Sequence, residues 1–144
     1  MKRSTRGYVL ILCFLILIVH TAGSCDQTDL TGTITLLDDA ATVHMPLPLE
    51  LEVPEHLAEI YRVHWDVDPA LAGEVLYGDK LVENTTAEQR QQYFGSKENF
   101  RMDRHALFLP RKPGMITLSV EGFFRQTNPQ PITTIEIEIK TAEN

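Results

Sequence analysis

The chain has 144 residues, with 13 Lys and Arg against 20 Asp and Glu, and a formal net charge of −7. This acidity argues against a task that depends on binding the phosphate backbone of nucleic acid. The sequence contains no internal repeat and no low-complexity tract, so a single globular domain is expected.

The N-terminus has the pattern of an export signal. Three cations, Lys2, Arg3 and Arg6, precede an uninterrupted apolar run, Tyr8–Val19. About 12 residues at about 1.5 Å each span roughly 18 Å as a helix, which is short of the roughly 30 Å hydrocarbon layer of a bilayer. The run therefore predicts the apolar region of a signal peptide over residues 1–24, and an uncleaved membrane anchor is the alternative.

Small residues lead from this run directly into a cysteine. The order Ala22-Gly23-Ser24-Cys25 resembles the lipobox of bacterial lipoproteins. In that family the cysteine becomes the first residue of the mature protein and carries diacylglycerol on its sulfur. The resemblance thus implies lipidation of Cys25 and attachment to a membrane of the cell envelope on its non-cytoplasmic side. Ordinary signal peptidase would cut the same bond after Ala-x-Ser and leave Cys25 free, so plain secretion is a second alternative.

The cysteine count agrees with a lipid on Cys25. The other cysteine, Cys13, lies inside the apolar run, so the mature chain has one cysteine and no internal partner for it. A lone exposed thiol in an oxidising compartment is reactive, whereas a thioether is chemically quiet. Asp26 resembles the signal that retains some enterobacterial lipoproteins in the inner membrane, and the choice between inner and outer membrane stays open.

Cleavage before Cys25 would leave 120 residues and remove three cations and no acids. Ten cations then face 20 acids, a formal charge of −10, which repels anionic lipid head groups. Residues 25–32 are expected to form a short polar tether, residues 33–140 the folded domain and residues 141–144 a tail.

Alternating apolar and polar residues predict about seven strands. These strands are expected over residues 33–37, 43–53, 61–69, 75–77, 105–109, 115–124 and 132–139. In the second strand Pro46 and Pro48 cannot donate to a ladder, so its first half is expected at a sheet edge or bulge.

The third predicted strand, Tyr61–Pro69, contains the only tryptophan and has one solvent-facing side. The apolar face comprises Tyr61, Val63, Trp65 and Val67, and the polar face comprises Arg62, His64, Asp66 and Asp68. Trp65 is expected at the centre of the core.

One short surface helix is predicted between the fourth and fifth strands. The order Thr85-Thr86-Ala87-Glu88 resembles a capping box, and Gly95 suits a left-handed C-terminal cap. Tyr93 and Phe94 are expected to turn toward the sheets.

Strand number and spacing are typical of an immunoglobulin-like (Ig-like) β-sandwich. Three segments, Trp65-Asp-Val, Ala106-Leu-Phe108-Leu-Pro and the stretch that begins Lys112-Pro-Gly114-Met, also resemble strands of bacterial PKD-like and other Ig-like domains. The resemblance implies an antiparallel sandwich of the broad Ig-like class, a scaffold used for spacing, display and binding.

His64, Asp66 and Asp68 are candidate metal ligands, joined by His44 or Glu50 from another strand. Imidazole and carboxylate groups suit zinc, and carboxylates alone suit calcium. However, positions i to i+4 of a strand spread over about 14 Å, so an ordinary solvent-facing strand is the preferred interpretation. The sequence also has no Walker loop, no His-Glu-x-x-His and no Gly-x-Ser-x-Gly, and we expect no enzymatic activity and no cofactor.

Four of the ten mature cations, Arg101, Arg104, Arg111 and Lys112, fall within twelve residues. They are a candidate patch for docking an anionic partner. The alternative, which we prefer, is that Arg104 and Arg111 balance the acidic strands that contain Glu50–Glu52 and Glu136–Glu138.

The sequence therefore predicts a non-catalytic, lipid-anchored envelope protein whose Ig-like domain is a protein-binding or structural module. The alternative is a ligand- or metal-binding envelope lipoprotein that uses His64, Asp66 and Asp68. Another envelope protein is the expected partner, and the oligomeric state stays open.

Overall fold

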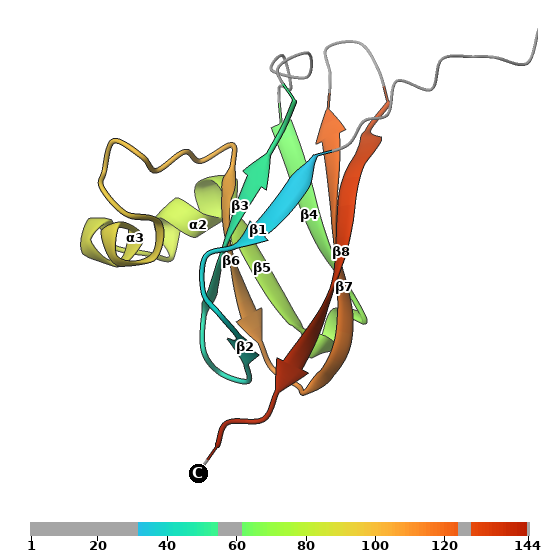
Figure 1. The fold of residues 1–144 in the computed structure, drawn as a ribbon. Coiled ribbons are helices and arrows are strands. Elements are labelled where there is room, and N and C mark those ends of the chain that lie inside the picture. Colours follow the sequence, from blue (N-terminus) through green and yellow to red (C-terminus); the bar gives the residue numbers. More distant parts are fainter. Residues whose placement is uncertain (1–31, 55–61, 124–127, 144) are drawn as a thin grey trace, which may run out of the picture.

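A computed structural model describes residues 32–54, 62–123 and 128–143, which form two four-stranded sheets packed face to face (Figure 1). The first sheet has the order β1 (Thr33–Leu36), β3 (Leu47–Glu52), β6 (His105–Pro110), β5 (Gly73–Tyr77). The second has the order β2 (Ala41–Thr42), β8 (Gln130–Lys140), β7 (Gly114–Phe123), β4 (Arg62–Asp68). Three helical elements complete the described part of the chain: the 3-10 turn η2 (Ala70–Ala72), α2 (Gly78–Glu83) and α3 (Ala87–Phe94).

The strand order confirms the Ig-like sandwich. Strands β1, β3, β6 and β5 occupy the positions of A, B, E and D of an immunoglobulin domain, and β4, β7 and β8 those of C, F and G. All neighbouring strands are antiparallel except β2, which pairs in parallel with the end of β8. The described residues thus contain eight strands, one more than predicted, because the two-residue β2 carries no alternation that a sequence pattern could reveal.

The tryptophan strand is confirmed as β4. Its exposed and buried residues alternate along its whole length, with Val63, Trp65 and Val67 buried. Tyr61, the first residue of the predicted strand, lies outside the described residues. Trp65 lies opposite Val120 of β7 and packs into the apolar layer between the sheets. That layer also contains the inward-facing residues of the other strands, among them Ile34, Leu49, Phe108, Leu118 and Ile137.

The predicted continuous strand over residues 43–53 is wrong in its first half. Residues 43–46 form a turn in which His44 has a positive φ of 65°, and β3 begins only at Leu47. At this point the chain crosses from the second sheet to the first, so the alternation seen in the sequence is interrupted in space. Pro48 is accommodated inside β3, where its carbonyl accepts a hydrogen bond from the backbone N–H of Leu37 at 2.9 Å.

Two helices, not one, lie between β5 and β6. The predicted helix is α3, but its N-cap is Thr86, whose side chain accepts from the backbone N–H of Gln89 while the Gln89 side chain accepts from that of Thr86. The capping box therefore begins one residue later than predicted. Gly95 follows with a positive φ of 86°, and Phe94 is buried. The missed helix, α2, spans Gly78–Glu83 and begins directly after β5.

The helices pack on the outer face of the first sheet, on the left of Figure 1. Their contact is a second apolar cluster of buried side chains, Leu76, Leu81, Phe94 and Leu107, with partly buried Tyr93, Phe100 and Leu109 around it. Leu76 and Leu107 alternate with inward-facing neighbours on β5 and β6, so these two strands have apolar side chains on both faces.

Candidate functional site

The polar face of β4 is exposed, as expected, but its histidine has a structural contact. Nδ1 of His64 lies 2.6 Å from the hydroxyl of Tyr77, which comes from β5 in the opposite sheet. The two rings meet edge to face, with their centroids 5.7 Å apart. This hydrogen bond joins the two sheets along the edge where β4 and β5 face each other.

The structure does not bring together the proposed metal ligands. Glu50 belongs to the first sheet and lies beside His105, and His44 lies in the turn before β3. Asp66 and Asp68 project from β4 into solvent. In the part of the chain that the structure describes, no group of three His, Cys, Asp or Glu residues is placed to hold a metal ion.

The predicted basic patch is divided between the two ends of β6. Arg101 and Arg104 precede the strand, and both pair with Asp103, at 3.1 and 3.2 Å. Arg111 and Lys112 follow it, and the six residues of β6 between them span about 20 Å. The four cations therefore do not form one surface.

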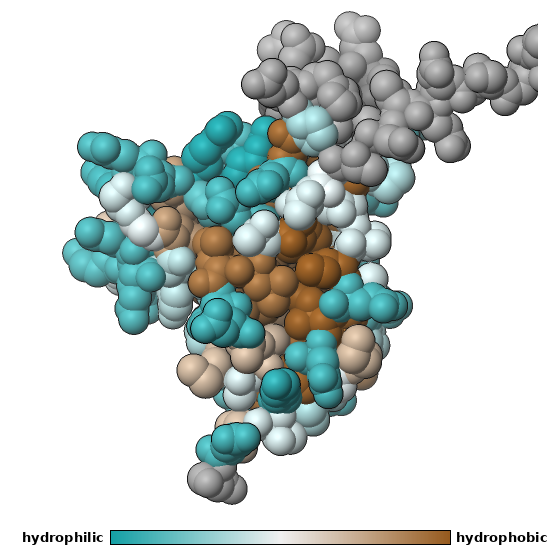
Figure 2. Space-filling view, in the orientation of Figure 1, coloured by the Kyte–Doolittle hydropathy of each residue, from teal (hydrophilic) through white to brown (hydrophobic). Residues whose placement is uncertain are grey.

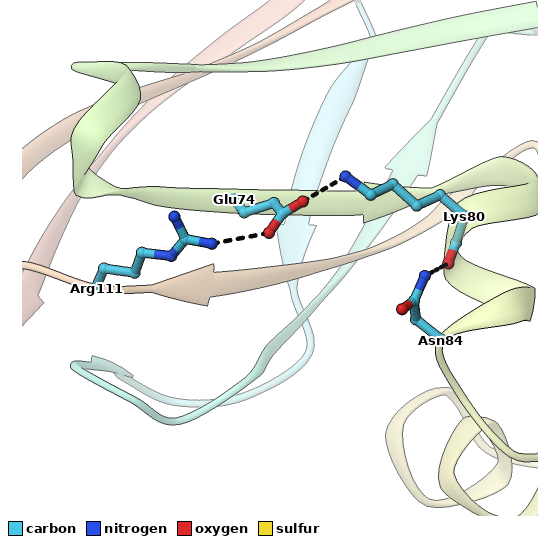
Figure 3. A network of polar contacts seen from close by, with 4 residues as sticks. All are labelled: Glu74, Lys80, Asn84 and Arg111. Atoms are coloured by element: carbon cyan, nitrogen blue, oxygen red, sulfur yellow. Dashed lines mark hydrogen bonds and ion pairs between the residues drawn. The ribbon is translucent and has the colours of Figure 1, made fainter.

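Arg111 belongs to a network on the outer side of β5 (Figure 3). Glu74 accepts from Nη2 of Arg111 at 3.0 Å through one oxygen and contacts Nζ of Lys80 through the other. The hydrogen bond from Lys80, with the nearby positive charge of Arg111, holds the pKa of Glu74 below its ordinary value. Asn84 then donates to the carbonyl of Lys80 at 2.7 Å, which links the network to the C-terminal end of α2.

Arg104 and Arg111 are thus neutralised by carboxylates, as we preferred, but by other carboxylates than those we expected. Arg104 and Arg111 pair with Asp103 and Glu74, and not with Glu50–Glu52 or Glu136–Glu138. The sequence could not reveal this, because Glu74 and Arg111 are 37 positions apart and meet only through the pairing of β5 with β6.

A buried histidine that the sequence did not single out joins the helices to the first sheet. The side chain of His105 is 4% exposed, and its ring is 4.8 Å from that of Phe94 and 5.6 Å from that of Phe100, centroid to centroid. Its Nδ1 accepts a hydrogen bond from the backbone N–H of Arg101 at 2.8 Å. Burial lowers the pKa of His105, although Glu50 lies 3.7 Å from Nε2 and opposes that shift.

Cys25 and residues 25–31 of the expected tether lie outside the described residues. None of the described helices is long and apolar enough to span a bilayer.

Comparison with solved structures finds a partial similarity. The chain is similar to a solved structure described as the D00-D0 domain of Intimin. The match has 16% sequence identity and a TM-score of 0.43, and it covers 78% of this chain and 48% of that one. The chain therefore spans about half the length of the structure it matches. No family model matches the sequence, and no curated protein does. The Ig-like assignment above rests on strand order and not on this match.

Proposed function

We propose that this chain is a non-catalytic lipoprotein of the bacterial cell envelope, in which a lipid on Cys25 holds the Ig-like sandwich at the non-cytoplasmic face of a membrane. The sandwich there binds or positions another envelope protein. The observation that carries this proposal is the order Ala22-Gly23-Ser24-Cys25 directly after an apolar run of signal-peptide length, followed within eight residues by the first strand of a folded domain.

The short distance between Cys25 and Thr33 limits where the domain can lie. Eight fully extended residues reach about 28 Å at most. The end of the sandwich at which β1 begins, together with the start of β4 and the end of β7, would then face the bilayer (Figure 1). The opposite end, with the turn at residues 43–46 and the C-terminal end of β8, points away from it.

The negative charge of the domain supports an arrangement in which its sheet faces do not lie on the membrane surface. The outer face of the second sheet is lined by exposed carboxylates from three strands: Asp66, Asp68, Glu121, Glu136 and Glu138. Anionic head groups repel such a face, so lipid and not protein surface would provide the attachment.

The shifted pKa values also support a binding or structural task. A strongly shifted pKa, at a residue that lies in a cleft, is common among catalytic residues. In the described residues the three shifted groups each have a structural cause: an ion pair for Glu74, hydrogen bonds at the start of α3 for Glu88, and burial among aromatic rings for His105.

The proposal is tested in living cells by comparing the wild-type chain with Cys25→Ser. Both are expressed in a bacterial host, crosslinked in the intact envelope and separated into membrane and soluble fractions. We expect the wild-type chain in salt-washed membranes with a crosslinked partner, and the serine variant outside them. A serine variant that stays in salt-washed membranes would overturn the lipid anchor, and a wild-type chain without any envelope crosslink would overturn the binding task.

A further inference from the structure

Among the described residues, little covers the outer edge of β8. On one side β8 pairs with β7 over most of its length, but on the other side β2 covers only Ile139 and Lys140. At the far end a single hydrogen bond, from the backbone N–H of Gly32 to the carbonyl of Ile132 at 3.2 Å, closes the edge. Between these two points, residues 133–137 pair with no described strand on this side.

The backbone polar groups of this edge point outward in a regular order. The carbonyl of Lys140 accepts from the N–H of Val43 at 2.9 Å, so the polar groups of Lys140 face the β2 side. Alternate residues of a strand direct their N–H and C=O groups to the same neighbour. Thr134 and Glu136 therefore present donors and acceptors to the open edge, where another strand can pair with them.

Beside this edge the apolar layer of the sandwich reaches the surface. Strand β1 pairs with β3 in the other sheet and not with this edge of β8, so Leu36 and Ile135 are only partly buried and Leu37 is 39% exposed. Figure 2 shows a continuous apolar patch in the region where β1 and β8 lie in Figure 1. A strand added to β8 would direct every second side chain toward this patch.

The exposed carboxylates near the apolar patch favour a partner that carries positive charge. Glu136 and Glu138 are exposed on the outward side of β8, and Asp38 and Asp39 are exposed in the segment that follows β1. No described cation pairs with any of the four. A second copy of this chain is a poor occupant, because two β8 edges placed side by side bring their glutamates together.

We infer that an extended segment of another envelope protein adds to β8 as a further strand, with apolar side chains directed into the patch and Lys or Arg side chains beside Glu136 and Glu138. This mode of recognition gives affinity through backbone hydrogen bonds and selectivity through alternate side chains. The inference rests on the binding task proposed above, but not on the lipid anchor.

The test uses a fluorescent octapeptide of alternating valine and lysine, added to the full chain in non-ionic detergent at physiological salt. We expect saturable binding by anisotropy. The same peptide with its alternate amides N-methylated keeps its charge and apolar character but cannot form the ladder, so we expect its affinity to fall at least tenfold. Equal affinity of the two peptides, or no binding of the first, would contradict strand addition.

Three variants place the binding at this edge. Thr134→Pro removes an N–H that faces the open edge and not β7, so the sheet is retained, and we expect peptide affinity to fall at least tenfold. Glu136→Lys should weaken binding similarly. Asp66→Lys makes the same charge change on β4, at the opposite edge of the same sheet, and should leave affinity within about twofold.

An equal loss of peptide affinity in the Asp66→Lys and Glu136→Lys variants would show that the peptide is held only by long-range charge attraction, and this would overturn the inference. So would a concentration-dependent dimer of the wild-type chain that Thr134→Pro abolishes, since the occupant would then be a second copy. Cys25→Ser should bind the peptide like wild type, so a failed anchor and a failed strand addition give different results. An envelope crosslink that survives in Thr134→Pro would place the partner on another surface and overturn the inference, while leaving the binding task intact.

Discussion

Nδ1 of His105 accepts a hydrogen bond from the backbone N–H of Arg101 at 2.8 Å, and this contact joins the segment that contains α2 and α3 to the first residue of β6. Only an unprotonated Nδ1 can accept this bond. The fold therefore stabilises the neutral imidazole, in agreement with its buried position between Phe94 and Phe100.

The first prediction concerns acid sensitivity. The pKa of His105 is lower in the folded chain than its ordinary value of 6.5, so the unfolded chain takes up a proton first as the pH falls. The free energy of unfolding contributed by this group is complete above about pH 6.5 and is lost as the pH falls toward the lowered pKa. The charged groups around it are Glu50 on β3, and Arg101 and Asp103 before β6.

Urea unfolding at pH 7.5 and pH 5.5 measures this effect. His105→Gln provides the matched control, because an amide oxygen can accept from Arg101 without titrating. We expect the wild-type chain to lose more stability between the two pH values than the glutamine variant does. Equal losses would show that protonation of His105 does not limit stability.

The second prediction concerns Trp65 at the centre of the sandwich. Trp65→Ala should lower the free energy of unfolding by about 3–5 kcal/mol, since it leaves a large cavity between the sheets. Trp65→Phe should cost only about 1–2 kcal/mol, because the indole N–H is buried without a hydrogen-bond partner among the described residues and its removal leaves no donor unpaired. Leu71→Ala, at a residue that is 74% exposed, is the control and should change stability by less than about 0.5 kcal/mol. Comparable losses in the alanine and phenylalanine variants of Trp65 would contradict this account of the core.

The third prediction concerns the start of α3. Thr86→Ala removes the N-cap and should cost about 1 kcal/mol, seen as faster hydrogen exchange of the amides of α3. Thr86→Ser keeps a hydroxyl acceptor, so the amides of α3 should exchange hydrogen at the same rate as in the wild-type chain. If serine were as damaging as alanine, the loss would have to come from the methyl group and not from the cap.

The fourth prediction concerns the network around Glu74. The carboxylate is about one-third exposed, so Glu74→Gln should cost no more than about 1 kcal/mol at low salt and still less at 1 M salt. Because the pKa of Glu74 is lowered from 4.5, its contribution is complete above about pH 4.5 and is lost as the pH falls further. Glu121→Gln on the exposed face of β7 is the control and should change stability little. A loss in Glu74→Gln that is insensitive to salt would argue against the ion pairs.

Period-two alternation was enough to predict most of the sandwich. It located β4, β7 and β8, whose buried and exposed sides follow from the sequence directly, and it indicated the two-sheet class. It failed at residues 43–46, where the chain leaves one sheet for the other while its apolar residues continue to alternate. Alternation describes the faces of a strand and says nothing about which sheet the strand joins.

The contacts that depend on strand pairing were beyond prediction for the same reason. His64 meets Tyr77 and Arg111 meets Glu74 only because strands from different parts of the chain are packed together. His105 meets Phe94 and Phe100 because α3 and the segment after it fold back onto the start of β6. The uncovered edge of β8 is a property of strand order, since it exists because β1 pairs with β3. The proposed lipid site differs from all of these, because it rests on a local sequence motif that can be recognised without knowledge of the fold.

The state of Cys25 tests the central proposal most directly. The wild-type chain and Cys25→Ser are grown in a bacterial host with an alkyne-bearing fatty acid, with and without globomycin, and the mature N-terminus is determined by mass spectrometry. We expect the label on a mature chain that begins at Cys25 with a diacylglycerol thioether, no label in the serine variant, and an accumulated precursor under globomycin. A wild-type chain that begins at an unmodified Cys25, or that is processed normally in globomycin, would contradict the lipoprotein assignment.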